Sequence, residues 1–490
     1  MNGTVGRPRN VVIAGYGMAG ARLAENIRTR DPRGERLSVT VVGAEPHAAY
    51  NRVLLSSVVA GTLPRDAVTL HPESWAAEHD VTLRLGETVS AIDTAARTVR
   101  VHGPDGEPAA LDYDALVLAQ GSSPWIPPVD GLVHEDGSLA TGVCAFRTLD
   151  DCAEIAGRAR AGTPVAVIGG GLLGIEAARG LAGRGCRVTV IHPYSHVMER
   201  QLDRGAGDVL AGTLAGYGIE FRTGTTAARY VPGDGVKLDD GGYVPADLVV
   251  VSAGVRPETG LAASAGLEVD RGIVVDDCLR TSDPRVHAIG DCAQHPGTPP
   301  GLVQPAWDQA GVLADLLTGA DGAGRYRGTA AVTRLKASGV DLASFGDVGA
   351  EPDSPDDEVV CLNDPARGRY AKLVLRDDLV TGGVLLGVPD AAANVAHHYT
   401  HRTPAPADRL AFLLGRTLPE ESVRAPSPAS MPGSVTVCEC NNVPKSGLVD
   451  AWRRGARSVS GLAEATRATT GCGSCTGLVR GIADWLESTE

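Results

Sequence analysis

The hydrophobic pattern near the N-terminus alternates between short apolar runs and amphipathic segments. Val11–Ala14 and Val39–Val42 have the length of buried strands, and Ala21–Ile27 between them has helical spacing. A further short apolar run, Val286–Ile289, predicts another strand. Strands that alternate with helices in this way predict an α/β protein in which short turns join each strand to the next helix.

The C-terminal part of the chain has a different pattern, because helical spacing dominates there. Val443–Trp452 and Val459–Thr466 have this spacing, and a third helix is predicted directly after Cys475. Its apolar residues recur every three or four positions: Leu478, Val479, Ile482, Trp485 and Leu486. The preceding residues 416–433 lose periodicity and gain Pro and Ser, which is typical of a linker.

Composition agrees with several α/β domains rather than one large core, because the 490 residues include 62 Gly and only 4 Phe. The formal net charge is −14 and no run of basic residues occurs, so we expect no nucleic-acid partner. No apolar stretch reaches membrane-spanning length, and the first glycine motif begins too early for a cleavable signal peptide. We therefore expect no membrane partner and a cytoplasmic protein.

Two glycine-rich turns predict two dinucleotide sites. Gly15, Gly17 and Gly20 lie between a predicted strand and a predicted helix, where a pyrophosphate can approach the backbone and the helix N-terminus. Glu45, beyond the next strand, is predicted to bind the adenosine ribose. One such motif is weak evidence, since glycines also allow close packing, but a second copy raises its weight.

The second copy consists of Gly169, Gly171 and Gly174 in VAVIGGGLLGIEAA. Glu176 follows on the first turn of the predicted helix, where it either borders a nicotinamide or only stabilises the helix N-terminus. His192 stands at the end of the next strand, where NAD sites often have an acid and NADP sites recruit Arg. The absence of an arginine cluster there slightly favours NADH.

Four cysteines near the C-terminus predict a metal centre. Cys438-x-Cys440 is followed, after thirty-one residues, by Cys472-x-x-Cys475, and two close pairs of thiolates suit a [2Fe–2S] cluster. A structural zinc ion stays possible, although zinc sites more usually combine two C-x2-C pairs with a shorter gap. A c-type haem needs His directly after the second Cys, where Thr476 stands. The scattered spacing of the other six cysteines indicates a reducing compartment rather than disulfides.

The segment Val437–Leu478, with CECNN and ATRATTGCGSC, resembles the bacterioferritin-associated-ferredoxin-like [2Fe–2S] domain. The sequence VHAIGDCA is similar to the GD motif of two-dinucleotide-domain flavoproteins, which implies that Asp291 binds the flavin ribityl chain. By motif order, the first turn then holds FAD and the second NAD(P)H. Leu116–Pro128 resembles the crossover between the two domains, with Gln120 in place of the usual Thr.

Further segments resemble the flavoprotein half of NAD(P)H-dependent assimilatory nitrite reductases and the electron-transfer subunits of assimilatory nitrate reductases. They include AAYNRVLLSSVVAG, HVMERQLD and LKASGVDLASFGD, and the resemblance spans almost the whole chain. It implies that Arg52 lies against the isoalloxazine and stabilises reduced flavin, although a surface arginine after a turn is the alternative. No Cys-x4-Cys pair occurs in the N-terminal region, so dithiol chemistry on the flavin is not expected.

The resemblance implies a pyridine nucleotide-disulfide oxidoreductase-like α/β flavoprotein with a third α+β domain and a small helical [2Fe–2S] domain. The expected ranges are an FAD-binding domain at 1–140 and 247–325, an NAD(P)H-binding domain at 141–246, a third, interface domain at 326–415, a linker at 416–433 and the cluster domain at 434–490.

The expected activity is an NAD(P)H-dependent flavoprotein oxidoreductase that passes single electrons through FAD and the cluster to a redox partner. Nitrite reductases continue into a sirohaem and [4Fe–4S] domain, whereas this sequence ends at Glu490. The expected partner is therefore the catalytic subunit of an assimilatory nitrate reductase. The alternatives are a reductase for a separate nitrite reductase or other redox partner, and a flavin reductase carrying a zinc or regulatory-cluster docking module.

Overall fold

The computed structural model describes residues 7–103, 106, 108–297, 299, 301–416, 428–429, 431–433, 435–438, 441, 443–470 and 475–489. The chain divides into two compact units. The first comprises Met1–Arg52, Pro64–Trp125 and Gly254–Ala331, and the second Val53–Leu63, Ile126–Ala253 and Val332–Glu490.

A parallel five-stranded sheet, in the order β19-β7-β1-β2-β3, forms the centre of the first unit. Its strands are β1 (Arg9–Ala14), β2 (Leu37–Gly43), β3 (Val81–Leu85), β7 (Ala115–Leu118) and β19 (Val286–Ala288). β1 and β2 contain the apolar runs expected from the sequence, and β19 contains the expected run Val286–Ile289 except its last residue. In register, residues 11–14 pair with 39–42 on one side and with 115–118 on the other. In a parallel sheet the strands are apolar along their whole length, because both faces of the sheet are covered.

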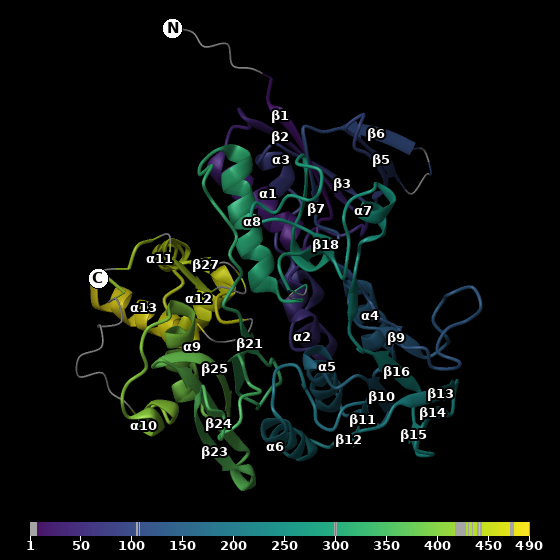
Figure 1. The fold of residues 1–490 in the computed structure, drawn as a ribbon, viewed down its shortest axis with the longest axis vertical. Helices are drawn as coiled ribbons and strands as arrows, with labels where there is room; N and C mark the ends of the chain where they lie inside the picture. Colours follow the sequence, from purple (N-terminus) through teal and green to yellow (C-terminus); the bar gives the residue numbers. More distant parts are fainter. Residues whose placement is uncertain are drawn as a thin grey trace. The chain divides into compact units, whose positions relative to one another are not determined.

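Two helices lie together beside this sheet (Figure 1). The helix α1 (Met18–Arg30) follows β1 after the first glycine turn, and α8 (Val303–Thr318) packs against it. Both helices contribute buried alanines and leucines to the core of the unit, which lets their backbones approach closely.

Smaller elements complete the first unit. They are β4 (Thr88–Asp93), β5 (Thr98–His102), β6 (Pro108–Asp112), β8 (Ser122–Pro124), β17 (Val255–Pro257), β18 (Ile273–Val274), β20 (Ala293–Gln294), α3 (Trp75–Glu78) and α7 (Gly260–Ser264). The strands β4, β5 and β6 form an antiparallel sheet, and β8 pairs with β17.

The second unit contains another parallel five-stranded sheet, in the order β12-β11-β10-β16-β9. Its strands are β9 (Val143–Ala145), β10 (Pro164–Ile168), β11 (Arg187–His192), β12 (Ile219–Thr223) and β16 (Leu248–Val251). The helices of this part are α2 (Leu55–Ala60), α4 (Leu149–Arg158), α5 (Leu172–Gly183) and α6 (Arg204–Ala215). A meander of β13 (Ala227–Val231), β14 (Gly235–Leu238) and β15 (Tyr243–Pro245) follows β12.

An antiparallel sheet follows in the same unit, in the order β21-β22-β25-β24-β23. It is built from β21 (Val332–Arg334), β22 (Leu342–Gly346), β23 (Glu358–Asp364), β24 (Arg369–Arg376) and β25 (Leu379–Leu386). The helices α9 (Pro389–His401) and α10 (Arg409–Leu413) add Val395 and Phe412 to its core. An antiparallel sheet with its helices on one side is an α+β arrangement.

An ion pair between a buried lysine and a half-buried aspartate joins this sheet to α6. Asp203 caps α6 by accepting from the amide of Ala206 at 2.9 Å. It also accepts from Lys372 Nζ at 2.8 Å and from the Tyr370 hydroxyl at 2.6 Å, and Lys372 is buried. Burial raises the pKa of Asp203, but the hydrogen bonds from Lys372, Tyr370 and Ala206 lower it more, so the net pKa lies below its ordinary value.

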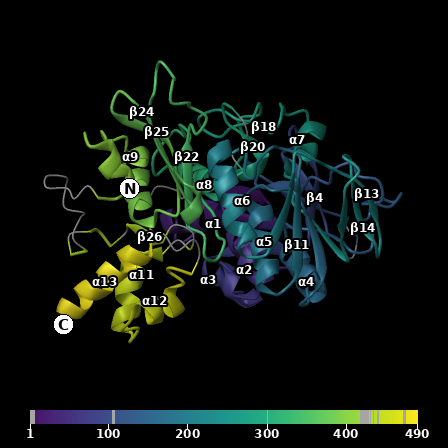
Figure 2. The same cartoon turned by 90° about the horizontal axis from the view of Figure 1, so that it is seen from below.

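Three helices dominate the C-terminal part, drawn in yellow in Figure 2. They are α11 (Lys445–Arg453), α12 (Val459–Thr466) and α13 (Thr476–Thr489), preceded by the short strands β26 (Thr436–Cys438) and β27 (Val443–Pro444). The expected helix over 443–452 begins two residues late. Pro444 holds an extended backbone at the position that caps α11, so Val443 pairs with Cys438 in the small sheet instead.

The fold class expected from the sequence is confirmed: two parallel sheets with glycine turns, an α+β part and a small helical part. Most of the predicted linker, residues 417–427 and 430, lies outside the described residues. In the part of the chain that the structure describes, no helix is both long and apolar enough to cross a membrane.

Candidate functional site

The first glycine turn joins β1 to α1 and brings two backbone segments into contact. Gly15 has φ +119°, and a Cβ there would overlap the carbonyl oxygen of Ala119. A Cβ at Gly20 would overlap the carbonyl oxygen of Gly15. Gly17 is the N-cap of α1 and offers no side-chain cap, so the first amides of the helix stay available to an anion.

The structure brings Glu45 and Arg52 together beside this turn. Their side chains form an ion pair, and the Tyr50 hydroxyl donates to the other oxygen of Glu45 at 2.6 Å. Arg52 Nε lies 3.8 Å from the position that a Cβ of Gly17 would take. Arg52 thus lies at the glycine turn. Its predicted contact with an isoalloxazine is not tested by this position and stays a prediction.

Asp291 lies on a short turn directly after β19. It accepts a hydrogen bond from Ser122 Oγ at 2.9 Å, and the preceding amide of Gly290 donates to Gln309 Oε1 at 2.7 Å. In the same region Gln120 Oε1 is buried without a hydrogen-bond partner in the structure. Gln120 is the residue that replaces the usual Thr. Its buried, unsatisfied oxygen can accept a hydrogen bond from a bound group.

The second glycine turn repeats the geometry of the first within its own sheet. Gly169 has φ +116°, and a Cβ there would overlap the carbonyl oxygen of Ser252. A Cβ at Gly174 would overlap the carbonyl oxygen of Gly169. Gly171 is the N-cap of α5 without a side-chain cap, and no atom lies within 4 Å of its Cβ position. This helix start can also receive an anion.

Glu176 is almost fully buried on α5 and its carboxylate is well supplied with donors. Ser56 Oγ donates to one oxygen at 2.9 Å. The other oxygen accepts from the backbone amide of Lys336 at 3.0 Å and from Lys336 Nζ at 2.9 Å. Three donors fix the orientation of the carboxylate, so it is suited to positioning its surroundings.

The sequence patterns did not identify Ser56 or Lys336 as partners of Glu176. Both residues stand in segments noted for their resemblance to reductases, AAYNRVLLSSVVAG and LKASGVDLASFGD. Lys336 is 160 residues away from Glu176, and no periodicity links positions at that separation.

Two of the four predicted cluster ligands lie within the described residues, and both are buried. Cys438 ends β26, Cys475 immediately precedes α13, and both belong to one hydrophobic cluster with Val443, Leu448 and Val479. The backbone amide of Thr469 donates to Cys475 Sγ at 3.3 Å. Cys440 and Cys472 lie outside the described residues.

The surroundings of Cys475 favour the thiolate form, which is the form that binds a metal centre. An amide donor to sulfur stabilises a thiolate, and Cys475 stands at the N-terminus of a helix. Lys445 is buried in the same small domain, with Nζ 2.6 Å from the carbonyl oxygen of Met431 and over the ring of Trp485. Among the described residues, no group of three or more His, Cys, Asp or Glu side chains is arranged to hold a metal ion.

Comparison with known families matches three parts of the chain. Residues 9–310 match the pyridine nucleotide-disulphide oxidoreductase family, residues 332–395 the C-terminal domain of rubredoxin NAD+ reductase, and residues 436–485 the BFD-like [2Fe-2S] binding domain. Since the first match covers more than half of the chain, the chain belongs to the pyridine nucleotide-disulphide oxidoreductase family.

Among curated relatives, the chain is 34% identical over 488 residues to the assimilatory nitrate reductase electron transfer subunit of Bacillus subtilis (strain 168), with 99% of this chain and 60% of that protein covered. It is 36% identical over 478 residues to an NAD(P)H nitrite reductase of the same organism, with 97% and 57% covered. The chain thus spans less than two thirds of both relatives. Among solved structures, it matches the covalent putidaredoxin reductase–putidaredoxin complex with a TM-score of 0.73 and 27% identity, over 82% of this chain and 95% of that chain.

These findings confirm the predicted family resemblance and its cofactors. The family implies FAD and NAD(P)H, and the BFD-like domain implies a [2Fe–2S] cluster. The residues present fit all three. Two uncapped helix starts suit pyrophosphates, a buried orphan acceptor lies at Gln120, and the described cysteines are buried with an amide donor.

Proposed function

We propose that the protein takes hydride from NAD(P)H and delivers electrons singly to a partner reductase. The observation that carries the proposal is the combination in one chain of two uncapped glycine turns and a domain with buried cysteines. When bound, FAD accepts the two electrons of a hydride and the [2Fe–2S] cluster accepts and passes on one at a time. The protein's own residues bind and orient these groups.

The first glycine turn is the proposed FAD site. Gly15, Gly17 and Gly20 hold the backbone open for the pyrophosphate, and the amides at the start of α1 donate to it. Glu45, fixed by the Tyr50 hydroxyl, accepts from the ribose hydroxyls. Asp291, fixed by Ser122, faces the ribityl chain.

Arg52 is the proposed cation of the same site. Its ion pair with Glu45 and its position by Gly17 favour contact with the negatively charged pyrophosphate. The sequence-based expectation of a contact with the isoalloxazine requires the side chain to leave Glu45 when the cofactor binds.

The second glycine turn is the proposed NAD(P)H site. Gly169, Gly171 and Gly174 play the same part as their counterparts in the first turn. Glu176 borders the nicotinamide as a positioning residue, because its three donors fix the carboxylate.

Cys438, Cys440, Cys472 and Cys475 are the proposed cluster ligands. Support comes from the domain match and from the burial of the two described cysteines in one core. The domain ranges expected from the sequence are retained as part of the proposal, with 434–490 as the cluster domain.

The proposed partner is the catalytic subunit of an assimilatory nitrate reductase, and the proposed compartment is the cytoplasm. The nitrate reductase relative supports this choice because its match extends over 99% of the chain. The match to a nitrite reductase makes a nitrite reductase the second candidate partner.

The test replaces Cys475 with Ser and compares it with Cys361→Ser, which changes an exposed cysteine on β23. Protein is purified without air, and iron, acid-labile sulfide and the paramagnetic signal after reduction are measured. In Cys475→Ser we expect the signal to disappear and transfer to the catalytic subunit to fall at least about a hundredfold, because the cluster path is gone. Oxidation of NADH by an artificial two-electron acceptor should stay within about twofold, because that reaction needs only the flavin.

Cys361→Ser should behave like the unaltered protein in all five measurements: iron, acid-labile sulfide, the paramagnetic signal, transfer to the catalytic subunit and oxidation of NADH by the artificial acceptor. Zinc in place of iron in the unaltered protein would contradict the cluster. Transfer to a nitrite reductase but not to a nitrate reductase would reassign the partner and leave the rest of the proposal standing.

A further inference from the structure

The end of β11 lies against the second glycine turn. β10 and β11 run in parallel with Ile168 paired to Ile191, so His192 stands level with the turn. The amide of Gly170, the middle residue of the turn, donates to His192 Nδ1 at 3.0 Å. In dinucleotide sites the residue at the end of this strand faces the adenosine ribose.

His192 itself has no ring nitrogen left for a ribose hydroxyl. Nδ1 accepts from Gly170, so the proton of the neutral ring is on Nε2. Nε2 donates that proton to Glu199 Oε2 at 3.1 Å. The imidazole is 4% exposed and therefore connects the turn to the carboxylate rather than to solvent.

Glu199 presents an ionised carboxylate at this point. Burial raises its pKa, but the hydrogen bond from His192, the bond from its own backbone and the charge of Arg200 outweigh burial, so the net pKa is below its ordinary value. The side chain is 20% exposed. A carboxylate has sites for about four donors and only one is taken by His192, so ribose hydroxyls can donate to it.

The loop that carries Glu199 is fixed to the turn as well. The amide of the preceding residue, Met198, donates to the carbonyl oxygen of Gly170 at 2.9 Å. The carboxylate is thus attached to Gly170 through two independent bonds, one through the backbone and one through the imidazole of His192.

We propose that Glu199, held by His192, binds the adenosine ribose hydroxyls and makes the site selective for NADH over NADPH. The inference rests on the proposed function, because it assumes that the second turn holds NAD(P)H. A 2′-phosphate would bring two negative charges against the carboxylate, which disfavours NADPH. Arg200, the next residue after Glu199, is exposed and would attract the 2′-phosphate when the charge of Glu199 is removed by substitution.

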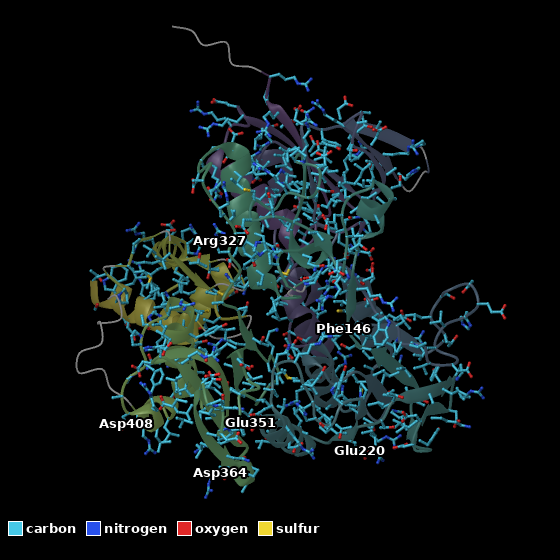
Figure 3. The ribbon with its side chains drawn as sticks, in the orientation of Figure 1. Phe146, Glu220, Arg327, Glu351, Asp364 and Asp408 are labelled. Carbon is cyan, nitrogen blue, oxygen red and sulfur yellow. The ribbon has the colours of Figure 1, made fainter. Side chains whose placement is uncertain are left out.

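The test uses Glu199→Gln, which keeps the size of the side chain and removes its charge. Glu220→Gln is the matched control, because Glu220, labelled in Figure 3, is an exposed acid on the neighbouring strand β12. Binding of ADP-ribose and of 2′-phospho-ADP-ribose to the purified full-length protein with its flavin is measured by calorimetry. The ratio of kcat/KM for NADH and NADPH with an artificial acceptor is measured in parallel.

In Glu199→Gln we expect the affinity for 2′-phospho-ADP-ribose to rise about tenfold, because a like-charge contact is removed. The affinity for ADP-ribose should fall about threefold, because hydrogen bonds to a charged acceptor are lost. The kcat/KM ratio should move in the same direction. A second variant, His192→Phe, should reduce the discrimination without removing the carboxylate, because the anchor of Glu199 is lost.

Glu220→Gln should leave both affinities unchanged. If the unaltered protein binds both probes and their ratio is the same in Glu199→Gln, the inference is overturned while the proposed function stands. If the unaltered protein binds neither probe, both are overturned.

Discussion

The two glycine turns have the same backbone and different surroundings. Gly15 and Gly169 have φ values of +119° and +116°, and both are packed on a carbonyl oxygen of a neighbouring strand end. The middle residues differ, since Tyr16 stands in the first turn where Gly170 stands in the second. The backbone common to both sites serves any dinucleotide, so the side chains around it must decide which one binds.

Two residues past the last glycine of each motif, the helices carry opposite charges. On α1 this residue is Arg22, which pairs with Glu25 at 3.1 Å and lies 4.6 Å from the ring of Trp307. On α5 it is Glu176, which pairs with Lys336 and is more deeply buried. The charge on α5 therefore depends on its partner far more than the charge on α1 does.

The largest expected effect comes from Lys336→Met. This change leaves the buried carboxylate of Glu176 without its cation, which costs about 3 to 5 kcal/mol of the free energy of unfolding. The equivalent change in the first helix, Glu25→Met, removes a partner that is 37% exposed and should cost less than about 1 kcal/mol. Hydrogen exchange of peptides from α5 and α1 measures the two effects separately.

Lys237→Met, on an exposed position of β14, controls for loss of a positive charge in the same unit. The double variant Glu176→Gln/Lys336→Met should recover most of the lost stability, since the buried charge is gone. Equal losses in Lys336→Met and Lys237→Met would mean that the ion pair does not stabilise α5.

The next largest effect concerns the backbone that both turns share. Gly15→Ala and Gly169→Ala should each cost about 2 to 3 kcal/mol, because the new Cβ meets a carbonyl oxygen in a backbone conformation that alanine disfavours. Gly17→Ala and Gly171→Ala have room for a Cβ and should cost less than about 1 kcal/mol. Thermal unfolding, flavin content and ADP-ribose binding are the measurements.

Gly15→Ala should lower the flavin content, and Gly169→Ala the affinity for ADP-ribose. The reverse outcome would exchange the proposed assignments of the two turns.

Local patterns predicted the parts of the fold that depend on neighbours in the sequence. The two glycine turns follow from apolar runs and spacing, and α12 has the expected bounds Val459–Thr466. The start of α11 was misjudged because apolar spacing does not register the constraint of Pro444. Cys438 and Cys475 were grouped by spacing and belong to one core.

Side-chain partners at long range were not predictable in the same way. Glu199 lies seven residues beyond His192 in a loop without periodicity, and Lys336 reaches Glu176 from the loop after β21. Periodicity states which face of an element is buried, but not which distant residue meets it. The charges that distinguish the two turns are of this second kind.

The smallest expected effect is a pH dependence of stability at the first turn. Tyr16 in the first turn shares a hydrogen bond of 2.9 Å with His71 Nδ1, and the ring of His71 stacks on Trp75 at 3.9 Å. Burial, with the nearby charges of His79 and Arg22, lowers the pKa of His71 from its ordinary value of 6.5 to about 4. In the same unit, burial likewise lowers the pKa of His287 to about 4.

Both histidines make the first unit less stable in acid. Because the unfolded chain binds these protons below about pH 6.5 and the folded unit only near pH 4, each histidine removes about 2 kcal/mol of stability as the pH falls from 6.5 to about 5. His71→Phe keeps the stack on Trp75 and should halve the pH dependence of exchange in peptides from β1 and α1, after correction for intrinsic rates. An unchanged dependence would mean that His71 is already protonated in the folded protein, and the Tyr16 hydroxyl would then have to accept from it rather than donate.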